Sequence, residues 1–181
     1  MKLIILDRDG VINEDSDDYI KSPEEFIAIP NSFEAITRLC HADYKVVIAT
    51  NQSGLARGYY DLDTLNSIHA KMHRLLEMHG GKIESIFFCP HTPDDNCLCR
   101  KPKTGMLDDI ASRYNISLEN VPFVGDSLTD IKAAQNAGAI PYLVKTGKGQ
   151  RTIKHAQANE LDNIPIYNDL NDVVNYFLNH N

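Results

Sequence analysis

The stretch LIILDRDGV at residues 3–11 predicts a buried strand that ends in two carboxylates and a glycine turn. Residues i and i+2 of an extended chain point to the same side, so Asp7 and Asp9 should face one way. Two acids at the end of a strand can divide a reaction between them, one attacking the substrate and the other transferring a proton. The alternative is an Asp-rich turn without chemistry, and later segments of the chain argue against it.

Short apolar runs alternate with longer amphipathic runs along the rest of the chain. Strands are expected at residues 2–6, 45–49, 85–88, 122–124 and 140–144, with a weaker one at 164–167. Helices are expected where apolar residues recur with the helical period, at residues 32–42, 62–79, 106–114, 129–137 and 170–178. This alternation predicts an α/β fold with a doubly wound, mostly parallel, Rossmann-like sheet, in a single domain spanning residues 1–181.

The bulk composition narrows the class of protein. The chain has 181 residues and a net charge of -7, and 43% of its residues are hydrophobic. The negative charge argues against a nonspecific nucleic-acid binder and against binding to anionic membranes. No apolar run approaches the ~20 residues that a transmembrane helix needs, and no signal peptide is evident. Three of the four cysteines lie with a histidine within eleven residues, which suggests bound metal in a reducing compartment and so a cytoplasmic protein. We expect a monomer that acts on a small molecule.

Polar residues gather where the expected strands end, and in a parallel sheet these ends share the edge at which ligands bind. Carboxylates there suit Mg²⁺, and a lysine beside hydroxyl groups suits phosphate oxygens. Besides Asp7 and Asp9, the residues at these ends are Thr50, Asn51, Gln52, Ser53, Arg100, Lys101, Asp126, Ser127 and Asp130. Three of them have plainer alternatives: Thr50 as an ordinary strand end, Lys101 as a solvated cation, and Asp130 as a helix cap.

Four of these segments occur in a characteristic order. They are Asp7–Gly10 (D-x-D-G), Thr50, Lys101 and Gly125–Asp130 (G-D-x-x-x-D). With them the chain resembles the haloacid-dehalogenase (HAD) superfamily of aspartate-nucleophile phosphatases. By this resemblance the last residue, Asp130, would orient Lys101 or a metal-bound water.

The resemblance implies a mechanism for the strand ends. Asp7 would attack phosphorus and form an aspartyl-phosphate, while Asp9 would protonate the leaving alkoxide and then deprotonate the attacking water. Mg²⁺ would lie between the Asp7 carboxylate, the Asp9 backbone carbonyl and Asp126. Thr50 and Lys101 would hold the phosphate oxygens.

A second metal site is indicated by the pattern C-x-H-x₅-C-x-C, formed by Cys89, His91, Cys97 and Cys99. Three thiolates and one imidazole fill a tetrahedral Zn²⁺ site and leave no open position, which is typical of structural zinc. Unrelated cysteines are the alternative. The fourth cysteine, Cys40, is expected in the core, and three histidines on one expected helix, His69, His73 and His79, at the surface or as packing residues.

The zinc pattern followed by R-K-P narrows the resemblance to two families without a large cap domain. One is the D-glycero-D-manno-heptose 1,7-bisphosphate 7-phosphatases, and the other is the histidinol-phosphate phosphatases of histidine biosynthesis. The stretches T-N-Q-S-G-L-A-R-G at residues 50–58 and R-K-P-K-T-G-M at residues 100–106 resemble the heptose enzymes. The short x₅ loop is familiar from the histidinol enzymes and keeps that alternative open.

The heptose resemblance implies a substrate with two phosphates. The enzyme would remove the C7 phosphate in ADP-heptose and lipopolysaccharide core biosynthesis. Arg57 and Arg100 are candidates to bind the phosphate that does not react. The full set of candidate substrate contacts is Asp15, Asn51, Gln52, Ser53, Arg57, Arg100 and Ser127.

A third possibility belongs to another class: a noncatalytic, zinc-stabilised binding module that has kept the fold and lost the chemistry. Such a module should lack at least one of Asp7, Asp9, Lys101 and Asp126. All four are present, so the sequence favours an enzyme.

Overall fold

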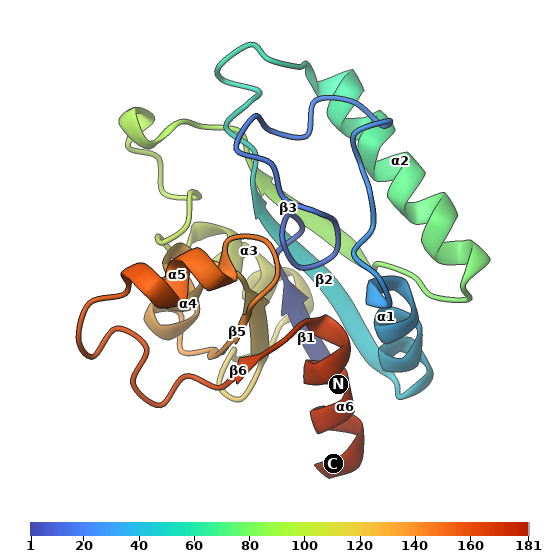
Figure 1. Cartoon of the computed structure of the whole chain (residues 1–181), viewed down its shortest axis with the longest axis vertical. Coiled ribbons are helices and arrows are strands. Elements are labelled where there is room, and N and C mark those ends of the chain that lie inside the picture. The colour runs from blue at the N-terminus through green and yellow to red at the C-terminus, as the bar shows by residue number, and fades with distance from the viewer. Residues whose placement is uncertain (181) are drawn as a thin grey trace.

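The computed structural model describes residues 1–180 and contains one six-stranded sheet (Figure 1). Its strand order is β3-β2-β1-β4-β5-β6, and every neighbouring pair runs parallel. The strands are β1 Lys2–Leu6, β2 Tyr44–Asn51, β3 Ser85–Cys89, β4 Pro122–Gly125, β5 Ile140–Val144 and β6 Ile166–Tyr167. The predicted doubly wound α/β fold is therefore confirmed, with a sheet that is wholly parallel in the described residues.

Helices cover both faces of this sheet. They are α1 Ser32–His41, α2 Leu62–Met78, α3 Gly105–Tyr114, α4 Leu128–Asn136, α5 Gly149–His155 and α6 Leu170–His180, with a short 3₁₀ turn η1 at Pro93–Asp95. Apolar residues of α1, α2 and α6 pack on one face, and those of α3 and α4 on the other. None of the helices within residues 1–180 has the length and apolar character required to cross a membrane.

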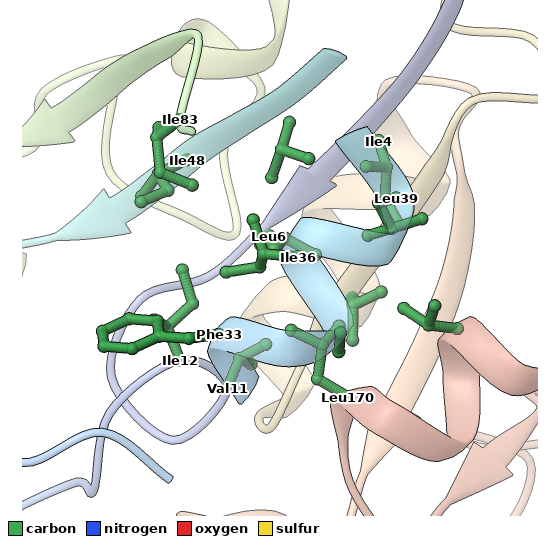
Figure 2. Close-up of a cluster of buried hydrophobic side chains, with 14 of the residues drawn as sticks. Ile4, Leu6, Val11, Ile12, Phe33, Ile36, Leu39, Ile48, Ile83 and Leu170 are labelled. Carbon is green, nitrogen blue, oxygen red and sulfur yellow. The ribbon is translucent and has the colours of Figure 1, made fainter. Parts of the chain in front are cut away.

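The two faces follow from the alternation of side chains along β1. Ile4 and Leu6 point into the core beneath α1, whereas Leu3 and Ile5 point into the core beneath α3 and α4. Figure 2 shows the first of these cores, with Ile36 and Leu39 of α1 lying over the strands. A strand that is buried on both faces is apolar on both, which is why residues 3–6 of β1 are an unbroken apolar run.

Two elements differ from the sequence expectation. Helix α5 was not predicted, because its sequence GQRTIKH has no apolar period and only its first residue, Gly149, is buried. Strand β6 covers Ile166–Tyr167 and not the expected residues 164–167, because only this short segment pairs with β5. The other helices and strands lie within two residues of their expected bounds.

The topology places one position of the sheet at a switch point. From β1 the chain moves to β2 and β3 on one side, and then returns past β1 to build β4, β5 and β6 on the other. Ligands in such sheets bind beyond the carboxyl ends of the strands at this point. Here those ends are Leu6 of β1 and Gly125 of β4, directly before Asp7 and Asp126.

Candidate active site

A cavity of about 370 Å³ opens at this switch point, within the roughly 300–1,000 Å³ range of small-molecule sites. Its lining comes from the ends of β1, β2 and β4, the loop that carries Lys101, the loop before α1, and the segment after β5. Of the candidates named from sequence, Asp7, Asp9, Asp15, Thr50, Asn51, Gln52, Ser53, Arg100, Lys101, Asp126, Ser127 and Asp130 line the cavity. Arg57 is exposed and does not.

Lys101 is buried between two carboxylates. Its Nζ lies 3.0 Å from Asp7 Oδ1 and 2.6 Å from Asp130 Oδ1, and it donates to the Ala49 carbonyl at 2.8 Å. Burial disfavours the ammonium, but the charges of Asp130 and Asp7 outweigh it and raise the pKa of Lys101. Lys101 is thus a fixed, charged donor beside Asp7 and not a solvated surface cation.

Asp130 has both of the roles that the sequence left open: it caps a helix, and it contacts Lys101. Its Oδ2 accepts from the backbone N–H of Asp126 and Ser127 and from the Ser127 hydroxyl, at 3.2, 3.1 and 2.6 Å. The Ser127 N–H contact, together with the Asp130 N–H donating back to Ser127 Oγ at 3.4 Å, forms a capping box at the start of α4. Its other oxygen meets Lys101. One side chain therefore caps the helix and orients the lysine.

Three carboxylates, those of Asp7, Asp126 and Asp130, offer oxygens within 4.8 Å of one another. Burial, more than offsetting the effect of Lys101, raises the pKa of Asp7 to about 7. Burial and the neighbouring carboxylates also raise the pKa of Asp126 well above its usual value. Crowded buried acids of this kind suit a hard divalent cation, which would relieve their repulsion. Within residues 1–180, Asp130 uses both carboxylate oxygens, on Lys101 and on the start of α4, whereas Asp7 uses only Oδ1, on Lys101, and Asp126 uses only Oδ2, on the Lys148 N–H. Asp7 and Asp126 are therefore the better suited of the three to a hard cation.

Asp9 lies in a cage of hydrogen-bond donors. Its Oδ1 accepts from Arg8 Nη2 at 2.8 Å, from Arg8 Nε at 3.1 Å and from Asn13 Nδ2 at 2.8 Å. Its Oδ2 accepts from Gln52 Nε2 at 2.9 Å. Burial acts to raise the pKa of Asp9, but Arg8, Asn13 and Gln52 lower it overall. Asp9 therefore rests as a carboxylate whose direction is fixed.

Of the other residues that line the cavity, some form hydrogen bonds with the backbone and others contribute charge. Asn51 binds the backbone of Lys101, accepting from its N–H at 3.1 Å and donating to its carbonyl at 3.2 Å. Arg100 donates to the His91 carbonyl at 3.2 Å. Asp15 lies 3.3 Å from the Nζ of Lys148. The lining of the cavity thus includes both an arginine and a lysine.

The predicted zinc ligands form a compact cluster beside the cavity. The Cys89 Sγ lies 3.0 Å from that of Cys99 and 3.6 Å from that of Cys97, and His91 Nδ1 lies 3.3 Å from Cys99 Sγ. A tetrahedral zinc with Zn–S near 2.3 Å separates sulfurs by about 3.8 Å. Cys97 Sγ lies near that distance from the sulfurs of Cys89 and Cys99, at 3.6 Å from each, and the Cys89–Cys99 pair is closer. All four cysteines of the chain are free of disulfides, and Cys40 lies apart. The donor set and its spacing fit Zn²⁺.

Comparison with known proteins identifies the family. A relative from Bordetella bronchiseptica, D-glycero-β-D-manno-heptose-1,7-bisphosphate 7-phosphatase, is 61% identical over 84% of this chain and 86% of its own. The chain belongs to the heptose-1,7-bisphosphate 7-phosphatase family. A second member, from Neisseria meningitidis, is 47% identical over 100% of this chain and 97% of its own.

The solved structures agree with this family assignment. The crystal structure of the D,D-heptose 1,7-bisphosphate phosphatase from B. bronchiseptica, complexed with magnesium and phosphate, is 54% identical. It covers 100% of both chains with a TM-score of 0.97. The HAD-hydrolase-like family model matches residues 98–173, which carry Lys101 and Asp126. The resemblance read from the sequence is therefore confirmed at both the superfamily and the family level.

Several residues of this heptose phosphatase family member were not singled out from its sequence. Lys148 lines the cavity, and its backbone N–H donates to Asp126 Oδ2 at 2.7 Å. Its position just after β5 could have identified it. His69, expected at the surface or as a packing residue, is buried, and its Nε2 lies 3.1 Å from Arg8 Nη1. No local pattern signals such a contact, because Arg8 and His69 are far apart in the chain.

Proposed function

We propose that this chain is a Mg²⁺-dependent phosphatase that removes the C7 phosphate of D-glycero-D-manno-heptose 1,7-bisphosphate. One observation carries this proposal: Asp7, Asp9, Lys101 and Asp126 meet in one cavity of a chain that is 61% identical to a heptose bisphosphate 7-phosphatase. The presence of the whole set disfavours the noncatalytic binding module. By its chemistry the product is a heptose 1-phosphate, and we place the enzyme in ADP-heptose and lipopolysaccharide core biosynthesis.

In this mechanism Asp7 attacks phosphorus and forms an aspartyl-phosphate, which water then hydrolyses. Lys101 and Thr50 bind the phosphoryl oxygens, and Lys101 also holds Asp7 in place at 3.0 Å. Mg²⁺, held by Asp7, Asp126 and the Asp9 carbonyl, supplies charge neutralisation between nucleophile and phosphate.

Asp9 transfers the protons in both steps. It rests as a carboxylate, and the negative charge of a bound phosphate raises its proton affinity, so it can carry a proton to the leaving alkoxide. In the second step the same carboxylate accepts a proton from the attacking water. Asp9 lines the same cavity as Asp7 and Lys101, which is consistent with both roles.

The cations that line the cavity favour a bisphosphate over histidinol phosphate as the substrate. Arg100 and Lys148 are cations suited to a second phosphate, whereas an amine needs an acid. Asp15, an acid that also lines the cavity, is already paired with Lys148. Arg57 is the weaker candidate, because it lies outside the cavity lining.

The β anomer is the proposed substrate form. The relatives with 61% and 47% identity are named for that anomer, and a relative from Photorhabdus laumondii with 36% identity is named for the α anomer. We further propose a cytoplasmic monomer with one structural zinc, since three zinc-bound thiolates persist most readily in a reducing compartment.

A side-by-side assay tests the function. Purified protein with Mg²⁺ is given heptose 1,7-bisphosphate, as each anomer, and histidinol phosphate, and phosphorus NMR follows which phosphate is released. Preferential loss of the C7 phosphate from the β anomer is expected. A higher kcat/KM for histidinol phosphate would overturn the substrate assignment while leaving the phosphatase chemistry in place.

A further inference from the structure

Arg8 is a fully buried cation that the catalytic steps do not use. It stands between Asp7 and Asp9 in the chain, and none of its side-chain surface is exposed. Its Nη2 and Nε bind Asp9 Oδ1, and its Nη1 lies 3.1 Å from His69 Nε2. A buried guanidinium needs partners for its five N–H groups, and Asp9 and His69 are two of them.

The chemistry of arginine fixes the state of His69. Arginine has donors only, so His69 Nε2 must be the acceptor and the imidazole must be neutral, with its proton on Nδ1. Burial, reinforced by the charge of Arg8, lowers the pKa of His69 to about 3, which agrees with a neutral ring. The neutral imidazole therefore accepts a hydrogen bond from the guanidinium and restrains its position.

A second chain of hydrogen bonds reaches the other oxygen of Asp9. The Tyr60 hydroxyl donates to Gln52 Oε1 at 2.6 Å, and Gln52 Nε2 donates to Asp9 Oδ2 at 2.9 Å. Because a carboxylate only accepts, the Gln52 NH₂ must face Asp9, and this leaves Gln52 Oε1 to accept from the Tyr60 hydroxyl. Tyr60 is buried, and burial raises its pKa to about 12, so its hydroxyl remains a donor.

Both series of hydrogen bonds, one through Arg8 and one through Gln52, end at α2 or just before it. Tyr60 precedes α2 by two residues, and His69 lies on the buried side of α2. Asp61 caps this helix by accepting from the Thr64 N–H at 2.8 Å, which fixes its start. The two anchors are therefore set by one element that makes no direct contribution to the cavity lining.

We infer that His69 and Tyr60 are positioning residues that hold the Asp9 carboxylate in its proton-transfer geometry, through Arg8 and Gln52 respectively. This inference rests on the proposed function, in which Asp9 protonates the leaving group. Arg8 donates to both oxygens of Asp9 and Gln52 donates to Oδ2, so rotation of the carboxylate is resisted at both oxygens. Proton transfer depends steeply on donor–acceptor geometry, and small displacements can cost ~10²-fold in rate.

The test uses matched variants. Tyr60→Phe removes only the hydroxyl, with Tyr59→Phe on the exposed neighbour as its control. His69→Leu removes the acceptor, with His73→Leu one turn further along α2 as its control. His69→Gln restores a carbonyl acceptor. Asp9→Asn provides the reference for loss of the proton-transfer group itself, and thermal melts establish that each variant is folded.

The readout is kcat/KM on phenyl phosphate and on p-nitrophenyl phosphate, two aryl esters that differ in one nitro group, which makes the leaving oxygen of the second far less dependent on a proton. kcat/KM reports the steps up to departure of the leaving group. We expect Tyr60→Phe and His69→Leu to lose ~10–100-fold on phenyl phosphate, part of the ~10²–10⁴-fold worth of proton transfer. On p-nitrophenyl phosphate they should lose far less. Both controls should match the wild type, and His69→Gln should recover most of the loss.

Equal losses on the two substrates, or none, in folded Tyr60→Phe and His69 variants would overturn the inference, since a purely structural role affects both substrates alike. If His69→Leu does not fold, His69→Phe, a ring without a nitrogen acceptor, takes its place and should show the same selective loss, while Tyr60→Phe tests the path through Gln52 independently. Asp9→Asn distinguishes the proton-transfer role of Asp9 from the positioning roles of His69 and Tyr60. Selective loss in Asp9→Asn alone would overturn only the positioning roles, whereas equal losses in Asp9→Asn would overturn the proton-transfer role of Asp9 and this inference with it.

Discussion

At the scale of single residues, Lys101 explains why the buried carboxylates of this site can remain ready to react. Its ammonium lies 3.0 Å from Asp7 and 2.6 Å from Asp130, so one cation serves the proposed nucleophile and the helix cap together. Removing one partner of a buried charge pair leaves the other uncompensated, which typically costs ~3–5 kcal/mol. Substitutions here should therefore keep the side chain's shape if they are to test chemistry and not folding.

Asp7→Asn meets that condition and is the first prediction. The amide keeps nearly the same shape but cannot attack phosphorus, so we expect no detectable turnover from a folded protein. Phosphate release and thermal melts measure the two effects separately. Asp18→Asn, on an exposed residue outside the cavity lining, is the control and should behave as the wild type. Undiminished turnover by folded Asp7→Asn would contradict the nucleophile assignment.

The second prediction concerns Arg100 and the phosphate that does not react. A charge-assisted hydrogen bond is worth ~1.5–3 kcal/mol, so Arg100→Ala should lower kcat/KM for the bisphosphate by roughly 10–150-fold. Turnover of p-nitrophenyl phosphate, which has no second phosphate, should barely change. Arg74→Ala, an exposed arginine on α2, is the matched control. Equal losses on both substrates would instead place Arg100 at the reacting phosphate or in the fold.

At the scale of elements, the turns after β1 and β5 close around one carboxylate. A Cβ at Gly10 or at Gly147 would overlap the side chain of Asp126, and both glycines have positive φ, of 83° and 55°. Glycine is the residue that allows both the backbone conformation and the close approach. The position of Asp126, and with it the proposed Mg²⁺ site, depends on these two turns.

The third prediction therefore compares two glycines. Gly10→Ala should displace Asp126 and abolish the Mg²⁺ response of phosphate release, because the added methyl group has no free space. Gly58→Ala carries a similar backbone cost, at a φ of 71°, but a Cβ there meets nothing within 4 Å. It should lose about 1–2 kcal/mol of stability and keep its Mg²⁺ dependence. Similar Mg²⁺ titrations for the two variants would refute the steric argument.

The fourth prediction concerns the loop that carries the four proposed zinc ligands. We expect about one zinc per chain by elemental analysis of protein purified without added metal. Cys97→Ser should abolish this zinc, whereas Cys40→Ser, outside the cluster, should retain it. Because Arg100 donates to the His91 carbonyl, zinc loss should weaken bisphosphate binding before the domain unfolds. A zinc-free wild type with freely titratable thiols would contradict the site.

At the scale of the whole molecule, the sequence predicted the parallel sheet and the residues at its strand ends, because both depend on local patterns. An apolar run such as Leu3–Leu6 followed by Asp7 is visible in the chain itself. Long-range contacts were not predictable in this way. The Arg8–His69 contact joins residues far apart in the sequence, and α5 packs too few apolar residues to show a helical period. Such features need the three-dimensional arrangement.

The two halves of the sheet meet along a short seam, and this gives the last prediction. Strand β1 pairs with β4 only at Ile5–Leu6 and Phe123–Val124, extended by the Asp7 N–H donating to the Val124 carbonyl at 2.9 Å. Asp7 and Asp126 lie just beyond this seam, one from each half. A Mg²⁺ ion bound to both carboxylates would therefore link the two halves of the molecule.

Binding at this seam should raise the melting temperature of the whole protein. Mg²⁺ with inorganic phosphate at ~100 times the dissociation constant contributes about 2.7 kcal/mol, or roughly 5–10 °C for a chain of this size. Differential scanning calorimetry with Mg²⁺ and phosphate, with either alone, and with EDTA measures the effect. Asp126→Asn is the control: it keeps the side chain's shape but weakens the metal site, so its melting temperature should respond far less. An equal rise in Asp126→Asn would mean that the ions act elsewhere on the protein and not across the β1–β4 seam.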